Sequence, residues 1–192
     1  MSKNARNNRT TLWLIGLLCA APVIASYLAF YVWQPEARTN YGDLLQPRPL
    51  PDATLAHLDG RPFRIADLRG RWVMLSIDAA DCLQLCQAKL FMMRQIRLMQ
   101  GRDMDRIERV FLVTNNGPLE TMLLREFDGT RVIRAEGSPS LKLFPAPQPN
   151  AISDHIYLID PRGNLMMRFP KNPEPSLVKK DIERLLKAQG AG

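Results

Sequence analysis

The sequence has 192 residues, of which 46% are hydrophobic and 23% are charged, an ordinary globular composition with room for one domain and an appendage. This composition excludes a disordered or collagen-like chain. The formal net charge is +7, but the basic residues form no long run and no stripe interleaved with aromatic residues, so no nucleic-acid partner is predicted.

The first predicted element is an uncharged segment over residues 12–33. At a rise of about 1.5 Å per residue, it is long enough to cross a hydrocarbon core of about 30 Å. A cleaved signal peptide would instead have an apolar region of about 7–15 residues followed by a small-x-small cleavage site. We therefore predict a transmembrane anchor over residues 12–33.

The flanks of this segment predict its orientation. Lys3, Arg6 and Arg9 lie before it, in a basic tail of residues 1–11. Because the positive-inside bias keeps such a tail in the cytoplasm, the rest of the chain is expected to face outward. We expect a single-pass protein of a bacterial inner membrane whose domain faces the periplasm, where a pair of thiols can be oxidised or can meet copper. Cys19 lies inside the anchor and is expected to take no part in that chemistry.

A proline-rich stretch, residues 34–53, follows the anchor and has no sustained periodicity. Such a composition is typical of a tether, and we expect it to hold the domain away from the membrane. The folded domain is then expected over residues 54–192.

The domain opens with strand patterns. Asp59-Gly60 separates two short apolar stretches, which predicts a hairpin. Residues 71–78 and 107–115 are apolar runs with β-branched and aromatic side chains, and each predicts a buried strand.

A helix is predicted between these two strands. Asp81 is its expected N-cap, and Gln84 stands three residues later, the spacing of a capping box. Its expected inward face has apolar side chains at intervals of three and four residues, namely Leu85, Ala88, Met92, Ile96 and Met99.

The remaining elements are a short helix, a strand pair and a last helix. The short helix is predicted over 119–127, the strands over 155–160 and 165–169 around a Pro-Arg-Gly-Asn turn, and the last helix over 176–189. Strand, helix, strand, helix, hairpin and helix is the order of an α/β thioredoxin-like domain. We therefore expect a central mixed sheet flanked by helices.

The strongest chemical motif is the CxxxC formed by Cys82 and Cys86, placed where the first buried strand turns into its helix. Four residues apart on a helix means one face, with α-carbons about 6 Å apart, which is within disulfide range. Oxidised thiols could close on each other, and two reduced thiolates would suit Cu(I). The alternative is that both are small core residues. Asp78 could be a buried carboxylate near them, or it could simply end the strand.

The chain resembles the Sco/SenC proteins, which are membrane-anchored thioredoxin-like factors that help to deliver copper to cytochrome c oxidase. The resemblance covers the single anchor, the strand WVMLSID, the CxxxC motif and the late segment 153–169. It implies that Cys82, Cys86 and a histidine, here His155, bind a copper ion as Cu(I) or Cu(II). It also implies that the two cysteines can exchange thiol and disulfide.

Two positions differ from the usual family pattern. Leu83 and Gln87 stand where proline usually follows each cysteine, and His155 precedes Tyr157 by two residues where the family has about five. In a regular strand an even offset turns the imidazole to the opposite side of the sheet. The proline-rich segment 145–149 predicts an irregular loop, which could instead carry His155 over the cysteine helix. We expect His155 to reach the cysteines by this route.

Three functions remain open. The first is a copper-binding assembly factor that passes the metal to a cytochrome c oxidase subunit or another copper protein. The second is a thiol-disulfide reductase that acts on the oxidase's copper-site cysteines or on another exported thiol protein. The third is a thioredoxin-like interaction module without either activity.

Overall fold

The computed structural model describes residues 3–32, 40–50 and 55–189. The chain divides into two compact units, Met1–Thr39 and Asn40–Gly192. The first contains one helix, α1 (Lys3–Val32). Its stretch Thr11–Leu28 is long and apolar enough to cross a membrane, in agreement with the predicted anchor.

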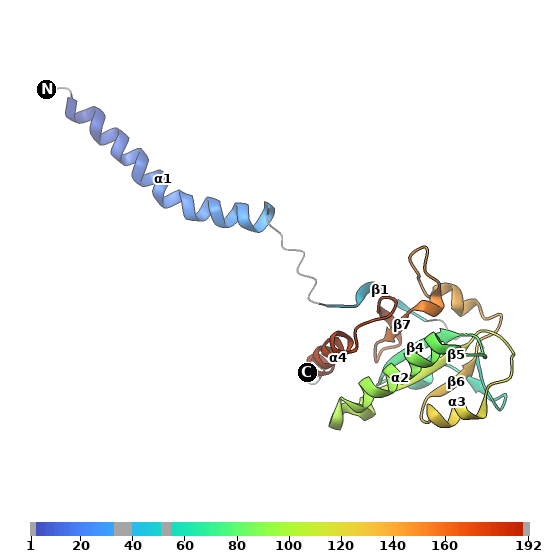
Figure 1. The fold of residues 1–192 in the computed structure, drawn as a ribbon. Coiled ribbons are helices and arrows are strands. Elements are labelled where there is room, and N and C mark those ends of the chain that lie inside the picture. The colour runs from blue at the N-terminus through green and yellow to red at the C-terminus, as the bar shows by residue number, and fades with distance from the viewer. Residues whose placement is uncertain (1–2, 33–39, 51–54, 190–192) are drawn as a thin grey trace. The chain divides into compact units, whose positions relative to one another are not determined.

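The second unit is built on an eight-stranded mixed sheet with the strand order β1-β8-β7-β4-β5-β6-β2-β3 (Figure 1). Strands β4, β5 and β6 run parallel, and the other neighbouring pairs are antiparallel. The strands are β1 (Asp43–Pro49), β2 (Leu55–His57), β3 (Pro62–Phe63), β4 (Trp72–Asp78), β5 (Ile107–Val113), β6 (Arg131–Arg134), β7 (Ile156–Ile159) and β8 (Asn164–Arg168).

Each face of this sheet carries its own core. One face is covered by α2 (Gln84–Leu98), α3 (Thr121–Glu126) and α4 (Pro175–Gln189), which pack against the side chains of Trp72 and Met74 in β4. The other face is covered by short 3₁₀ turns and by the β2–β3 hairpin, against Leu75 and Ile77 of the same strand. Successive residues of a strand point to opposite faces, so β4 contributes to both cores and reads as a continuous apolar run. We call these surfaces the helical face and the turn face.

The element order expected from the sequence is confirmed. The hairpin around Asp59-Gly60, both buried strands, the two later helices and the pair β7–β8 all form close to their predicted positions. Gly163 has a φ of 91°, which suits the turn between β7 and β8 because glycine adopts this region without a Cβ clash.

The tether prediction is wrong for Asp43–Pro49. These residues form β1, which pairs with β8 at one edge of the sheet and belongs to the second unit. Proline lacks the N–H needed inside a sheet but is tolerated on an edge strand, so the prolines do not prevent pairing here. Residues 34–39 and 51–53 of the predicted tether lie outside the described residues.

The predicted inward face of α2 is correct for Ile96, which is buried, and in part for Met92, which packs against the core, but it is wrong for Leu85, Ala88 and Met99. Leu85 and Met99 are 61% and 45% exposed, whereas the buried side chains of the helix are Cys86, Lys89, Leu90, Met93 and Ile96. The helix is therefore turned by about one residue, roughly 100°, from the predicted orientation. Because Cys86 is linked to the core through Cys82, the cysteine side of the helix faces inward.

Candidate functional site

Cys82 and Cys86 are joined by a disulfide, with 5.1 Å between their α-carbons. Both side chains belong to the core of the helical face. Cys19 is free. The structure thus joins the two cysteines that the spacing predicted to meet.

The backbone that joins them differs from the expected helical turn. The N-cap of α2 is Leu83 rather than Asp81, and it makes no side-chain capping hydrogen bond. Cys82 therefore lies before the helix, with a φ of 32°, and Cys86 lies in its first turn. This left-handed conformation is unusual for a residue with a Cβ. The Cys82 amide donates to the Ala79 carbonyl at 3.2 Å, and the tight turn brings the two cysteines together.

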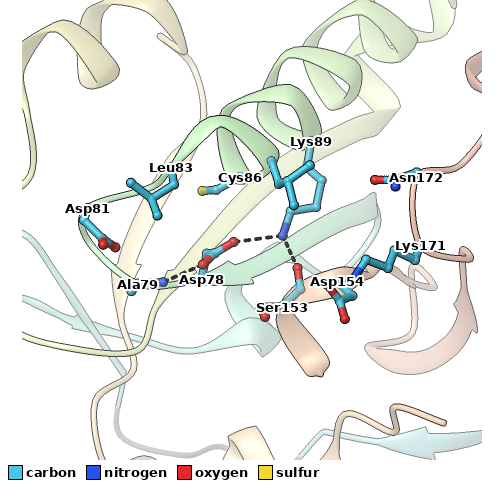
Figure 2. Close-up of a pocket in the computed structure, with 11 residues that line it drawn as sticks. Asp78, Ala79, Asp81, Leu83, Cys86, Lys89, Ser153, Asp154, Lys171 and Asn172 are labelled. Atoms are coloured by element: carbon cyan, nitrogen blue, oxygen red, sulfur yellow. Dashed lines mark hydrogen bonds and ion pairs between the residues drawn. The ribbon is translucent and has the colours of Figure 1, made fainter. Parts of the chain in front are cut away.

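A pocket of about 330 Å³ opens beside the disulfide (Figure 2). One wall is the segment from the end of β4 into α2, and the other comes from residues 153–154 and 171–172. Cys86 lines this pocket, whereas Cys82 does not. Leu83 and Leu85 lie at the pocket with most of their side-chain surface exposed.

Two lysines with carboxylate partners lie in the pocket. The ammonium of Lys89 is 3.0 Å from the Asp78 carboxylate and also donates to the Ser153 carbonyl (Figure 2). Lys171 pairs with Asp154 at 3.0 Å. The Ala151 amide and the Lys171 ammonium together hold the pKa of Asp154 below its ordinary value.

The sequence reasoning missed Lys89. Its signal was available, because Lys89 follows Cys86 by three residues and therefore shares its helix face. Only 7% of the surface of Lys89 is exposed, so the lysine is buried, whereas its partner Asp78 is partly exposed. Asp78 ends β4 as expected and lines the same pocket as Cys86, but its carboxylate is partly exposed rather than buried.

His155 lies on the other face of the sheet. It directly precedes β7, and its ring makes an edge contact with that of Tyr157, at 6.1 Å between ring centroids. Tyr157 belongs to the core of the turn face, whereas Ile156 and both cysteines belong to the core of the helical face. The even offset from Tyr157 therefore sets the direction of the imidazole, and the loop does not carry it over the cysteines.

The surroundings of His155 keep the ring neutral. It is 1% exposed, and its Nδ1 is 2.8 Å from the Phe169 carbonyl oxygen, which makes Nδ1 the protonated nitrogen. Burial lowers the pKa of His155, and the Phe169 hydrogen bond opposes this only in part. Its Nε2 is buried and has no hydrogen-bond partner among the described residues.

The donor set fits copper only in part. Reduced Cys82 and Cys86 would provide two soft sulfur ligands of the kind that suits Cu(I). Within the described part of the chain, no group of three or more His, Cys, Asp or Glu side chains could hold a metal ion. His155 as a third ligand therefore stays a prediction, and the present arrangement does not bring it to the cysteines. The disulfide itself is suited to accepting two electrons from thiols.

Comparison with known proteins agrees with this architecture. Residues 72–189 match the family model of the transmembrane-like, thioredoxin-like, C-terminal domain. No curated protein matches the sequence at a significant level.

Solved structures share the fold at low sequence identity. ScoI of Bradyrhizobium japonicum with copper bound is 19% identical, covering 71% of this chain and 99% of its own, with a TM-score of 0.52. Yeast Sco1 with copper bound is 16% identical, with coverages of 74% and 95% and a TM-score of 0.56. A putative protein disulfide isomerase of Bacteroides thetaiotaomicron is 19% identical, with coverages of 77% and 94% and a TM-score of 0.55. The thioredoxin-like fold expected from the Sco/SenC resemblance is therefore confirmed.

Proposed function

This chain belongs to the family of the transmembrane-like, thioredoxin-like, C-terminal domain, and we propose that it is a membrane-anchored thiol–disulfide exchange protein. The observation that carries this proposal is the Cys82–Cys86 disulfide, which lies at a strand-to-helix junction and beside a pocket that Cys86 lines. A purely structural crosslink between residues four apart closes a very short loop, and such a loop restricts the unfolded chain little.

The chemistry transfers two electrons between cysteine pairs. An exported protein with two thiols reduces the Cys82–Cys86 disulfide and is itself oxidised to a disulfide, with a mixed disulfide as the intermediate. The reverse reaction reduces a partner disulfide and reforms the bond between Cys82 and Cys86. The cysteines of an oxidase copper site are one candidate partner, which follows from the Sco/SenC resemblance.

The test uses the full chain in detergent with Cys19→Ser, so that only the pair can react. The oxidised protein is treated with dithiothreitol under native conditions, and free thiols are then counted with a maleimide that shifts gel mobility. We expect two thiols to appear while the domain remains folded, and the pair to close again with oxidised glutathione. If the disulfide can be reduced only in denaturant, it is a structural crosslink in the core, and the proposal is overturned.

A second candidate function is copper delivery to cytochrome c oxidase, favoured by the fold shared with two Sco proteins that have copper bound. The disulfide would first have to be reduced, because the thiolate is the form that binds a metal. Cys82 and Cys86 would then hold Cu(I), with His155 as the predicted third ligand. The test measures how much copper the reduced full chain binds and compares it with the double variant Cys82→Ser/Cys86→Ser. Equal copper contents in the two proteins would rule out copper delivery through these cysteines.

The proposed site of action is the periplasmic side of a bacterial inner membrane. It is supported by α1, which can span a bilayer, and by the basic residues Lys3, Arg6 and Arg9 that precede its apolar part. A reporter that is active only outside the cytoplasm, fused after Gly192, should be active. If the fusion reaches the membrane but its reporter is inactive, the domain faces the cytoplasm and the proposed orientation is wrong.

A further inference from the structure

The two sulfurs of the disulfide differ in access. Cys86 lines the pocket, and the exposed Leu83 and Leu85 lie beside it. Both side chains are buried in the core of the helical face, with 0% of Cys82 and 2% of Cys86 exposed, but Cys82 is absent from the pocket wall. A thiolate that enters through the pocket therefore meets Cys86 first (Figure 2).

We propose that Cys86 is the sulfur that bonds to the partner, and that Cys82 is the leaving and resolving thiol. This inference rests on the proposed exchange function. A thiolate displaces a sulfur along the extension of the S–S bond, and which sulfur is attacked depends on access. Approach from the pocket therefore expels Cys82 toward the core side.

The partner's thiolate forms a bond to the Sγ of Cys86, the bond between the two cysteines breaks, and its electron pair leaves on Cys82, which takes up a proton. The partner's second thiolate then attacks the partner's first sulfur, which is bonded to Cys86 in the mixed disulfide. A disulfide forms within the partner, and Cys86 is released as a thiolate. In the opposite direction, the Cys86 thiolate attacks a partner disulfide, and Cys82 then closes on Cys86.

The N-terminus of α2 favours a thiolate at Cys86, although three carboxylates also line the pocket, those of Asp78, Asp81 and Asp154. Cys86 lies in the first turn of α2, where the free backbone N–H groups and the helix dipole stabilise negative charge. Lys89 lies one turn further along the same buried face and carries its ammonium in the same pocket.

The test compares two single variants of the full chain in detergent, each with Cys19→Ser. Cys82→Ser leaves Cys86 free, and Cys86→Ser leaves Cys82 free, so the two are matched in having lost the disulfide. Each native protein is mixed with the aromatic disulfide 5,5′-dithiobis(2-nitrobenzoate), and the coloured thiolate that it releases is followed. We expect the Cys82→Ser variant to react at least about tenfold faster, because its remaining cysteine lines the pocket.

A pulse experiment on the reduced parent covers the case in which a variant does not fold. The reduced chain, with both cysteines present, receives a short pulse of iodoacetamide and is quenched with acid. Peptide mass spectrometry should find the label first on Cys86. Equal labelling, or faster labelling of Cys82, overturns the assignment of Cys86 but leaves the exchange function standing. If neither native cysteine reacts until denaturant is added, the exchange function falls as well.

Discussion

The two faces of the sheet carry different kinds of site, as a comparison of Asp154 with His155 illustrates. Asp154 is the last residue of the 3₁₀ turn Ile152–Asp154, and His155 directly precedes β7. Asp154 lines the pocket with Cys86 and Lys89, whereas His155 lies with Tyr157 on the turn face. Two neighbours in sequence therefore have different surroundings, and only Asp154 lines the pocket beside the disulfide.

The two faces also differ in how their polar groups are used. On the helical face, the pairs of Lys89 with Asp78 and of Lys171 with Asp154 border a pocket that a ligand can enter. On the turn face, the Tyr157 hydroxyl donates to the Pro145 carbonyl at 3.0 Å, which also accepts from Arg168. These bonds fasten the loop before β7 onto the sheet. We therefore interpret the helical face as the reactive one and the turn face as structural.

The largest expected effect is on the rate of thiol exchange, which should depend on the helical face and not on the turn face. Cys86→Ser should lower the rate of thiol exchange with dithiothreitol by more than about 100-fold, because no disulfide can form. His155→Gln should change that rate by less than about twofold, since the imidazole lies behind the sheet and a glutamine amide can still donate to Phe169. Stopped-flow measurement on the full chain compares the two. An equally large loss in His155→Gln, with the fold retained, would show that His155 acts at the cysteines.

The next effect compares the two lysines within the pocket. Lys89→Met leaves the partly buried Asp78 carboxylate without its partner, and we expect the free energy of unfolding to fall by about 1–3 kcal/mol. Lys171→Met is the matched control. Its pair is more exposed, so the loss should stay below about 1 kcal/mol. Urea unfolding measures both, and equal losses would mean that burial does not distinguish the two pairs.

On the turn face, Tyr157→Phe removes a single hydrogen bond and keeps the ring. The expected loss is about 1 kcal/mol in the free energy of unfolding, because the Pro145 carbonyl still accepts from Arg168. The exchange rate should be unchanged. A marked slowing of exchange with unchanged stability would couple the turn face to the disulfide, against the division proposed here.

The smallest expected effect is a pH dependence that arises from His155. Burial lowers the pKa of this residue in the folded protein below its ordinary value of 6.5, so the unfolded chain binds the proton more readily. Stability should therefore fall as the pH drops below about 6.5, and should stop falling from this cause once the folded pKa is passed. In His155→Gln this loss should disappear. Unfolding curves between about pH 8 and 5 measure it, and a fall of equal size in both proteins would assign it to other groups.

The fold was predictable because its strongest patterns are local. The apolar run of β4 and the turn at Gly163 specify their elements without help from distant residues. The edge strand β1 was not predictable in this way, because Pro47 and Pro49 argue against a strand unless the position at an edge is known. The short strand β6 has only Ile133 fully buried and gives little periodic signal.

The site was predictable in its cysteines and not in its surroundings. The spacing of Cys82 and Cys86 indicated a disulfide. The orientation of α2 was not predictable, because it follows a turn with a positive φ at Cys82 and no residue pattern predicts that turn. Leu85 looked like a core residue and is exposed, whereas Lys89 looked like a surface residue and is buried. For His155, the ring contact with Tyr157 agrees with the even offset between the two residues, and a role for His155 at the cysteines stays a prediction.

The most direct test of the redox role of the helical face is an equilibrium titration of the Cys82–Cys86 disulfide in the native full chain with Cys19→Ser. The protein is equilibrated in glutathione buffers of increasing reducing strength, the thiols are blocked at each ratio, and circular dichroism follows the fold in parallel. The account predicts one reversible two-electron transition within the range of these buffers, with the domain folded throughout. A disulfide that stays closed in the most reducing buffer, or that opens only as the domain unfolds, would contradict it.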